Sequence, residues 1–189
     1  MDKKRALKKI AAEIAACPLC KRGGTGSVVA GEGDPDAAVL FVGEAPGKEE
    51  AKTGRPFVGR SGKFLRQAMK DIGLTDEEVF ITSPAHYLPL RGTPSKETVL
   101  HGREHLMKQL AVIDPKIIVL LGATACLAVL DKKIELSEGH GTTIRKDGRT
   151  ILVTVHPAYA MRFPVGRKRF FGDFQKLKRL ISKMRSRDE

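Results

Sequence analysis

The sequence predicts an α/β fold, a three-layer sandwich in which a mostly parallel central sheet carries helices on both faces. Short apolar runs, AVLFVG (38–43), VFIT (79–82) and KIIVLLG (116–122), alternate with stretches of helical periodicity. The runs are continuously apolar, which is typical of parallel strands that are buried on both faces. Because 189 residues suit one such unit, we expect residues 1–189 to form a single domain.

The elements of the first half follow from spacing and from end signals. Residues 3–16 have the pattern of an amphipathic helix that ends at Cys17-Pro18. After the strand at 38–43, the segment 61–73 predicts a helix that Ser61 caps and Gly73 ends. One face of this helix is apolar and consists of Phe64, Leu65, Ala68, Met69 and Ile72.

The second half repeats the alternation. After the strand at 79–82, Thr93-Pro94 is expected to open a helix whose buried stripe is Val99, Leu106, Leu110 and Ile113. The strand at 116–122 leads into a helix at 123–130, and residues 142–155 predict a hairpin that turns at Asp147-Gly148. A last helix, at about 168–185, would expose lysines and arginines and bury Phe171, Phe174, Leu177, Ile181 and Met184.

Charge and composition narrow the class of partner. The formal net charge is +12 and the pI is near 9.8, which favours a polyanionic partner such as nucleic acid. No run approaches the ~20 apolar residues of a membrane span, and the start of the chain lacks a signal-peptide pattern, so we expect a cytoplasmic protein without a membrane partner. Three cysteines argue against a disulfide framework.

Three polar segments are expected to meet at one edge of the sheet. In open parallel sheets ligands bind beyond the carboxyl ends of the strands. That rule brings together GEAPGKEE (43–50), ITSPAHY (81–87) and VHPAYAMR (155–162). Neither of the common glycine-rich nucleotide-loop patterns fits GEAPG, and its carboxylates would repel phosphate. A histidine at a strand end is as often satisfied by the backbone as it is functional, but Tyr159 and Arg162 beside His156 favour a functional loop.

The combination of motifs resembles a known family. GEAPGKEE, GRPFVGRSG (54–62) and HPAYAMR (156–162), in this order and at this spacing, resemble the uracil-DNA glycosylase superfamily, specifically its family-4 type. The likeness extends from CPLC (17–20) through IDPKIIVLLGATA (113–125) to HPAY. It implies one glycosylase-like domain, most simply a monomer, that removes uracil or a related deaminated base from DNA in base excision repair. The base would first leave the stack and enter a pocket.

The resemblance also implies roles for individual residues. Phe57 would stack on the base, and His156 with backbone amides of the GEAPG turn, at Ala45 and Gly47, would stabilise the developing base anion. Glu50 would orient a water, face the sugar cation or exclude the methyl group of thymine, and Glu44 is the second candidate catalytic carboxylate. The candidate DNA contacts are Arg60, Tyr159, Met161 and Arg162. No lysine lies in an obvious nucleophile position, so no Schiff base is expected.

The chain departs from the family pattern at the position that reads the base edge. Family-4 members carry an asparagine after the Ile-Thr of the second strand, and here Ser83 occupies that place. Serine offers one short hydroxyl, whereas asparagine offers a donor and an acceptor. The base could therefore be hypoxanthine or xanthine instead of uracil. A second alternative is a relative that binds uracil-DNA without turnover.

The second departure concerns the metal. The family holds a [4Fe–4S] cluster with four cysteines, of which only Cys17 and Cys20 match; the other two positions are Tyr87 and Gly102. Cys126 lies where a small buried residue is expected, so a four-cysteine cluster cannot be assembled. His86 and His101 each precede a lost position, which leaves a Cys2His2 zinc site or a vestigial C-x-x-C as alternatives. The metal of this family is structural, so we expect catalysis to require no cofactor.

Overall fold

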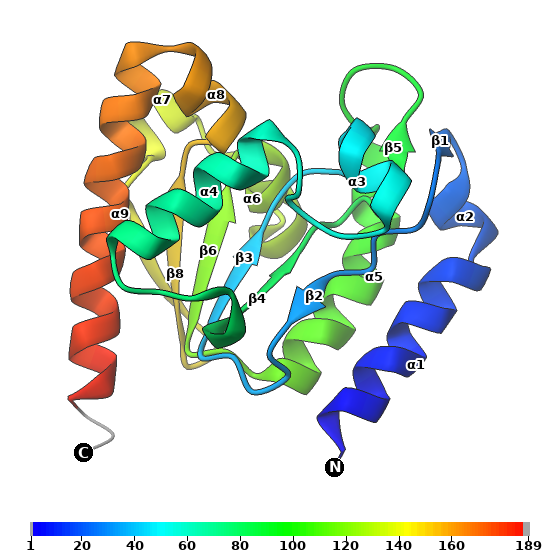
Figure 1. The fold of residues 1–189 in the computed structure, drawn as a ribbon, viewed down its shortest axis with the longest axis horizontal. Coiled ribbons are helices and arrows are strands. Elements are labelled where there is room, and N and C mark those ends of the chain that lie inside the picture. The colour runs from blue at the N-terminus through cyan, green and yellow to red at the C-terminus, as the bar shows by residue number, and fades with distance from the viewer. Residues whose placement is uncertain (1, 187–189) are drawn as a thin grey trace.

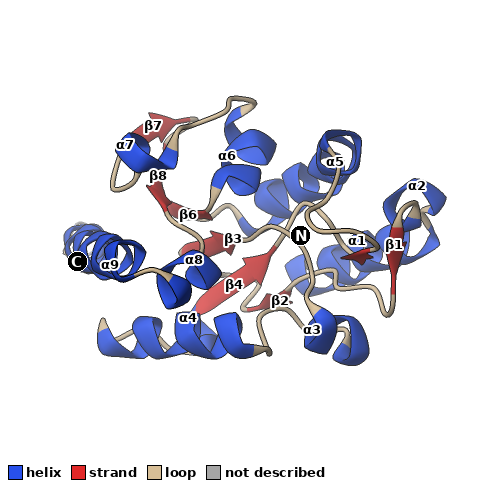
Figure 2. Ribbon diagram, turned by 90° about the horizontal axis from the view of Figure 1, so that it is seen from above, coloured by secondary structure: helices blue, strands red, loops and turns tan. Residues whose placement is uncertain are grey.

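The computed structural model describes residues 2–186 and contains a six-stranded sheet between two layers of helices. Figure 1 shows the sheet in the centre, and Figure 2, viewed from above, shows the helices on its two sides. The strand order is β2-β4-β3-β6-β8-β7. Its strands are β2 (Glu32–Gly33), β3 (Val39–Val42), β4 (Val79–Thr82), β6 (Ile117–Leu121), β7 (Thr143–Lys146) and β8 (Arg149–Thr154).

The four central strands are parallel and the two edge strands are antiparallel. β3 pairs in parallel with β4 and β6, and β6 pairs in parallel with β8. β2 and β7 run antiparallel to β4 and β8. A separate two-stranded sheet joins β1 (Gly24–Thr25) to β5 (Leu88–Pro89). The predicted α/β class with a mostly parallel sheet is confirmed.

Helices cover both faces of the sheet because alternate strand residues point to opposite sides. The larger helices are α1 (Lys3–Ala16), α4 (Arg60–Asp71), α5 (Lys96–Ile113), α6 (Ala123–Leu130) and α9 (Pro164–Arg185). The short ones are α2 (Pro18–Lys21), α3 (Lys48–Thr53), a 3₁₀ turn (Asp76–Glu78), α7 (Leu136–Gly139) and α8 (Pro157–Arg162). None of the helices in residues 2–186 is long and apolar enough to cross a lipid bilayer.

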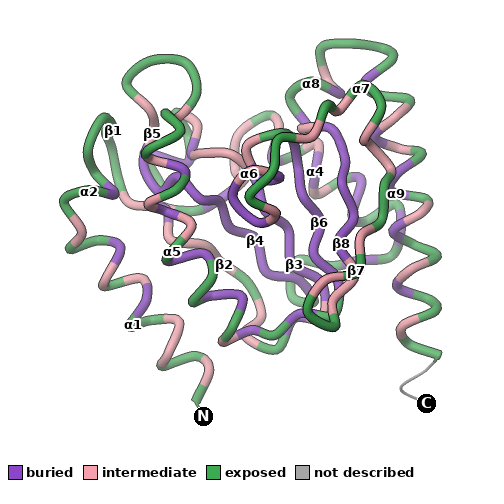
Figure 3. Tube along the Cα trace, turned by 180° about the vertical axis from the view of Figure 1, so that it is seen from behind, coloured by how far each residue is buried: buried purple, intermediate pink, exposed green. Residues whose placement is uncertain are grey.

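Each face of the sheet has its own buried cluster. Val39 and Phe41 of β3 pack on the side of α4 and α9, whereas Leu40 and Val42 pack on the side of α5 and α6. Figure 3 shows these strands as the most continuously buried part of the chain. A third, smaller cluster joins α1 and α2 to the segment after β4 and contains Ile10, Ile14, Cys20 and Tyr87.

Several helix ends differ from the predicted ones. α4 begins at Arg60 with Gly59 as its N-cap, so Ser61 lies inside the first turn and does not cap the helix. α5 begins at Lys96, because the Ser95 hydroxyl accepts a hydrogen bond from the Thr98 amide and displaces the expected Thr93-Pro94 start. α9 begins at Pro164, four residues before the predicted position, and its most buried ring is Phe170, whereas Phe171 is only partly buried.

The hairpin prediction is confirmed at the level of the backbone. β7 and β8 pair around Asp147-Gly148, which both have positive φ, 50° and 75°. Two positive φ angles are what a two-residue type I′ turn requires.

The carboxyl ends of β3, β4, β6 and β8 lie at the same edge of the sheet because these strands are parallel. Backbone hydrogen bonds continue past the strand ends. The Gly43 amide donates to the Thr82 carbonyl (2.8 Å), and the Gly122 amide donates to the Thr154 carbonyl (3.0 Å). The loops that leave these strands therefore start from fixed positions beside one another.

Candidate active site

A cavity of about 250 Å³ opens at this edge of the sheet. Its lining comes from residues at the ends of β3, β4 and β8 and the loops that follow them, and from Val29. Seven of the residues singled out from the sequence line it: Glu44, Ala45, Gly47, Glu50, Phe57, Ser83 and His156. The remaining lining residues are Val29, Pro46, Pro56, Ser61, Leu88, Pro89 and Gly92.

The Glu50 carboxylate is bonded on both oxygens to backbone amides. Oε1 accepts from the amides of Val58 and Gly59, each at 2.8 Å, and Oε2 accepts from the amide of Gly47 at 3.1 Å. The residue is buried, with 7% of its surface exposed. Glu50 thus ties the GEAPG turn to the loop that carries Phe57, which favours a loop-holding role over the orientation of a water.

Phe57 lies in a backbone conformation that few side-chain-bearing residues adopt, with φ of 52°. Its ring lies against the backbone of Gly43, where a Cβ would come within 2.7 Å of the ring. The Arg66 guanidinium donates to the carbonyls of Pro56 and Phe57, each at 3.2 Å, and also pairs with Asp76. The turn that presents this aromatic ring is therefore held on its amide side by Glu50 and on its carbonyl side by Arg66.

His156 lines the same cavity as Phe57, with the two ring centroids 6.2 Å apart. It is the N-cap of α8, and its Nδ1 accepts a hydrogen bond from the Ala158 amide at 3.2 Å. When Nδ1 accepts, the proton of the neutral imidazole is on Nε2, which can then donate. Burial lowers the pKa of His156 from its ordinary value, and the nearby Glu44 carboxylate opposes that shift.

Two further polar side chains line the cavity. One oxygen of Glu44, Oε2, accepts from the Thr124 hydroxyl at 2.8 Å. The buried Ser83 hydroxyl donates to the Ala85 carbonyl at 2.8 Å, within its own turn. Ser83 therefore occupies the predicted place at the end of β4, but its hydroxyl is engaged by the backbone.

The four candidate DNA contacts lie outside the cavity lining. Arg60 is the exposed first residue of α4, while Tyr159, Met161 and Arg162 belong to α8. Tyr159 and the neighbouring Phe163 are exposed aromatic residues whose ring centroids are 4.9 Å apart. The Arg162 guanidinium lies 5.4 Å from the centroid of the Phe163 ring. α8 thus presents two aromatic rings and a cation next to the cavity that His156 lines.

Sequence reasoning missed three residues of this region. Ser61, expected only as a helix cap, lines the cavity. Thr124 and Arg66 contact Glu44 and the Phe57 turn from helices α6 and α4. Ser61 lies within GRSG, beside Phe57, so its motif could have marked it. Long-range partners such as Thr124, 80 positions from Glu44, leave no local signal.

A second cluster of chemically active side chains lies between α2 and α5. Cys17, Cys20, His101 and His105 each place one donor atom within 4.8 Å of the others, so that these four residues could hold a metal ion. The Cys17 sulfur lies 3.1 Å from Nε2 of His101. Burial acts to raise the pKa of the Cys17 thiol, but hydrogen bonds from Cys20, His101 and His105 outweigh it and lower this pKa to about 6.

The expected histidine pair is partly wrong. His101 joins the cysteines, but His86 does not. Its Nδ1 lies 3.2 Å from the Val29 carbonyl, and burial lowers its pKa to about 4. The second histidine is His105, one helical turn after His101 on α5. The spacing H-x-x-x-H, paired with C-x-x-C, was the signal that could have found it.

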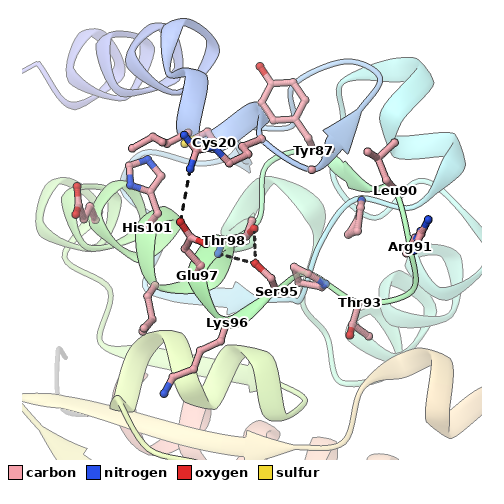
Figure 4. A pocket seen from close by; sticks show the side chains of 18 residues that line it. Cys20, Tyr87, Leu90, Arg91, Thr93, Ser95, Lys96, Glu97, Thr98 and His101 are labelled. Atoms are coloured by element: carbon pink, nitrogen blue, oxygen red, sulfur yellow. Dashed lines mark hydrogen bonds and ion pairs between the residues drawn. The ribbon is translucent and has the colours of Figure 1, made fainter.

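This cluster borders a different, larger cavity of about 950 Å³. Figure 4 shows Cys20 and His101 at the left of this cavity, Tyr87 at the top, and the loop that carries Leu90, Arg91 and Thr93 at the right. An ion pair between Arg22 and Glu97 crosses part of it at 3.7 Å. The two cavities share Pro89 of β5 in their linings.

Comparison with known proteins agrees with the motifs. A model of the uracil DNA glycosylase superfamily matches residues 30–178. A type-4 uracil-DNA glycosylase of Thermotoga maritima is 38% identical over 173 residues, which are 89% of each chain. Enzymes of the same name are 37% identical in Sulfurisphaera tokodaii (92% of this chain, 84% of the relative) and 33% identical in Archaeoglobus fulgidus (94% of each).

Proposed function

The chain belongs to the uracil DNA glycosylase superfamily, and on that premise we propose that it is a monofunctional DNA glycosylase that hydrolyses the bond between uracil and deoxyribose. The observation that carries the proposal is that an aromatic ring, Phe57, and a histidine, His156, line the same cavity, with 6.2 Å between their ring centroids. The cavity has a volume of about 250 Å³, below the ~300–1,000 Å³ of pockets for drug-sized ligands, which suits a ligand as small as a single flipped base.

The reaction makes opposite charges at two ends of one bond. The bond between C1′ of the sugar and N1 of uracil breaks, and its electron pair moves onto the base, where it is shared with the carbonyl oxygens. The sugar becomes cation-like until a water oxygen bonds to C1′ and releases a proton. Groups that stabilise the base anion or the sugar cation lower the barrier.

We propose that His156 and the GEAPG turn stabilise the base anion. Since Nδ1 of His156 accepts the Ala158 amide, Nε2–H of the neutral ring is the donor available to the anion. Ala45 lines the cavity, and within residues 2–186 no acceptor is found for its amide. The Gly47 amide, by contrast, donates to Glu50. Of the two amides expected to contact the base, we therefore propose that Ala45 makes the contact and Gly47 does not. Phe57 supplies the stacking face.

We propose that Glu44 acts on the sugar, where the positive charge develops. Both oxygens of Glu50 accept backbone hydrogen bonds, whereas in residues 2–186 a donor, Thr124, is found for Oε2 of Glu44 and none for Oε1. Glu44 therefore has an oxygen with which to orient the water or to face the sugar cation. Glu50 acts in this proposal by fixing Phe57, and its burial in the loop also limits the space beside the base.

DNA is held outside the cavity. Arg60 and Arg162 are exposed and suit contacts to phosphates, and Tyr159 and Met161 of α8 suit the minor groove. An aromatic residue that enters the stack beside the target base lowers the cost of extruding it. In this proposal the chain acts on cellular DNA as a monomer in the cytoplasm. The chemical step needs no cofactor.

A second candidate substrate class follows from Ser83. Its hydroxyl already donates to the Ala85 carbonyl. It therefore has fewer hydrogen bonds to give to the edge of uracil than an asparagine carboxamide has. A deaminated purine, hypoxanthine or xanthine, is the alternative base, and binding of uracil-DNA without turnover is the alternative outcome. Retention of Phe57, His156 and Glu44 in one cavity supports turnover.

One assay separates these functions. Duplex oligonucleotides that carry uracil, hypoxanthine or xanthine are incubated with the protein in buffer that contains a chelator, and heating in alkali then reveals abasic sites as strand breaks. We expect uracil opposite guanine to be released. Release of hypoxanthine or xanthine alone would move the chain to the second class, and binding without breaks would leave a DNA-binding relative. Activity that vanished with chelator while the protein stayed folded, and returned with added Mg²⁺, would contradict the metal-free reaction.

A further inference from the structure

The cluster between α2 and α5 does not fit the iron–sulfur cluster that the resemblance implies. A [4Fe–4S] cluster takes four cysteine thiolates. Cys17 and Cys20 supply two, and the positions of the other two hold Tyr87 and Gly102. A Cβ at position 102 would lie 1.7 Å from the Pro84 carbonyl oxygen, so this backbone has no room for a cysteine there. Cys126 is buried in another core cluster.

We propose that Cys17, Cys20, His101 and His105 instead hold a single zinc ion. Structural zinc is bound tetrahedrally by four sulfur and nitrogen donors, with Zn–S near ~2.3 Å and Zn–N near ~2.0 Å. Such bonds place neighbouring donor atoms ~3.3–3.8 Å apart. The four donors of this cluster lie within 4.8 Å of one another, and the Cys17 sulfur lies 3.1 Å from the His101 nitrogen. A set this compact suits one ion.

The two halves of the site are built locally. Cys17 is the N-cap of α2, and its sulfur accepts from the Cys20 amide at 3.5 Å, which brings both sulfurs to one side of a tight turn. His101 and His105 are four residues apart on α5, so their imidazoles share one face of that helix. Two thiolates and two neutral imidazoles neutralise Zn²⁺, which suits a site where Cys20 and His105 are buried.

An independent observation points to a missing ligand. His105 is 93% buried, and its Nδ1 has no hydrogen-bond partner in the described part of the chain. Nε2 of the buried His86 also lacks a partner there, but His86 is not among the four residues whose donor atoms lie within 4.8 Å of one another. A buried imidazole nitrogen without a partner is costly unless something unobserved binds the side chain. Metal-bound histidine is held by one ring nitrogen, and its orientation is then fixed by the metal. The wall of the larger cavity, which includes Cys20 and His101, gives the ion a route to the site (Figure 4).

The ion would hold α2 against α5. A small cluster, with Ile10, Ile14, Cys20 and Tyr87 as its buried members, packs α1 and α2 against the rest of the fold, and the Glu13–Lys108 ion pair (2.6 Å) adds an exposed contact between α1 and α5. Four protein ligands leave no open position, so the site is structural and not catalytic. It secures α2 to α5 next to β5, whose residues Leu88 and Pro89 line the candidate active site.

Metal analysis of the purified full-length protein, expressed with both zinc and iron in the medium, tests the proposal. We expect about one zinc per chain, no acid-labile sulfide and no visible absorption of an iron–sulfur cluster. His101→Ala and His105→Ala should lose most of the zinc. The matched controls are His86→Ala and Cys126→Ala, which change a neighbouring histidine and the third cysteine, and both should keep it.

If His105→Ala fails to fold, Co²⁺ added to the wild-type chain after zinc removal provides the second measurement. Tetrahedral cobalt bound by two thiolates gives intense absorption bands that an octahedral surface site does not. Iron with sulfide, absence of any bound metal, lack of these bands, or full zinc in folded His105→Ala would each overturn the proposal. Since metal content is measured without DNA, these results are independent of whether the glycosylase activity is found.

Discussion

Glu50→Gln is the substitution that best separates a residue that holds the loop from a residue that takes part in the reaction. The carboxylate accepts three backbone amides, from Gly47, Val58 and Gly59. A glutamine of the same shape has one oxygen acceptor and one NH₂ donor. If its oxygen faces Val58 and Gly59, its NH₂ meets the Gly47 amide, and two donors then oppose each other in a buried site.

The cost follows from these bonds. A hydrogen bond to a charged group contributes about 1.5–3 kcal/mol, so loss of the Gly47 bond should reduce the free energy of unfolding by about 2 kcal/mol. For a chain of this length that corresponds to a fall in melting temperature of roughly 4–8 °C. Since the same loop presents Phe57, a displacement of ~1 Å should lower the rate of uracil release by up to about 100-fold.

The assay combines thermal unfolding with single-turnover release of uracil. Glu49→Gln is the matched control, because Glu49 is the exposed neighbour and its ion pair with Lys52 (2.8 Å) is open to solvent, where such pairs add little to stability. We expect Glu50→Gln to lose stability and rate together, and Glu49→Gln to change neither by much. An unchanged melting temperature with a large loss of rate would refute the loop-holding argument and return Glu50 to the reaction itself.

Four further predictions concern His156, the pH profile, Ser83 and the binding of DNA. His156→Ala should slow uracil release by about 100-fold or more with little loss of DNA binding. Because burial lowers the pKa of His156, its neutral form persists below the ordinary value of 6.5, and the wild-type rate should not fall with a midpoint there; such a midpoint would contradict the neutral donor. Ser83→Asn should raise uracil release by about 10-fold relative to other bases, and a decrease would mean that other groups read the base. The logarithm of DNA affinity should fall linearly with the logarithm of salt concentration, with a slope of about −0.9 for each phosphate that the protein neutralises. An affinity that did not change with salt would mean that the net charge of +12 does not serve DNA binding.

The sequence alone determined the central strands, the larger helices and the edge of the sheet where the site lies, but not the short strands β1, β2 and β5. Apolar runs at 38–43, 79–82 and 116–122 allowed few other interpretations, because a continuously apolar strand needs cover on both faces. The carboxyl ends of parallel strands share one edge, so GEAPGKEE, Ser83 and His156 had to meet there. Local turn chemistry was equally readable at Asp147-Gly148.

Only the tertiary structure decided which partner each polar group takes. The carboxylates of Glu44 and Glu50 are equivalent as sequence letters, yet one accepts from Thr124 and the other from three amides of its own loops. His105 replaced His86 beside the cysteines because the face of α5 that meets α2 depends on packing, which periodicity gives only approximately. The pattern of apolar residues determines helices and strands because these depend on the geometry of neighbouring residues. Hydrogen-bond partners depend on distances between residues far apart in the sequence, which no local pattern encodes.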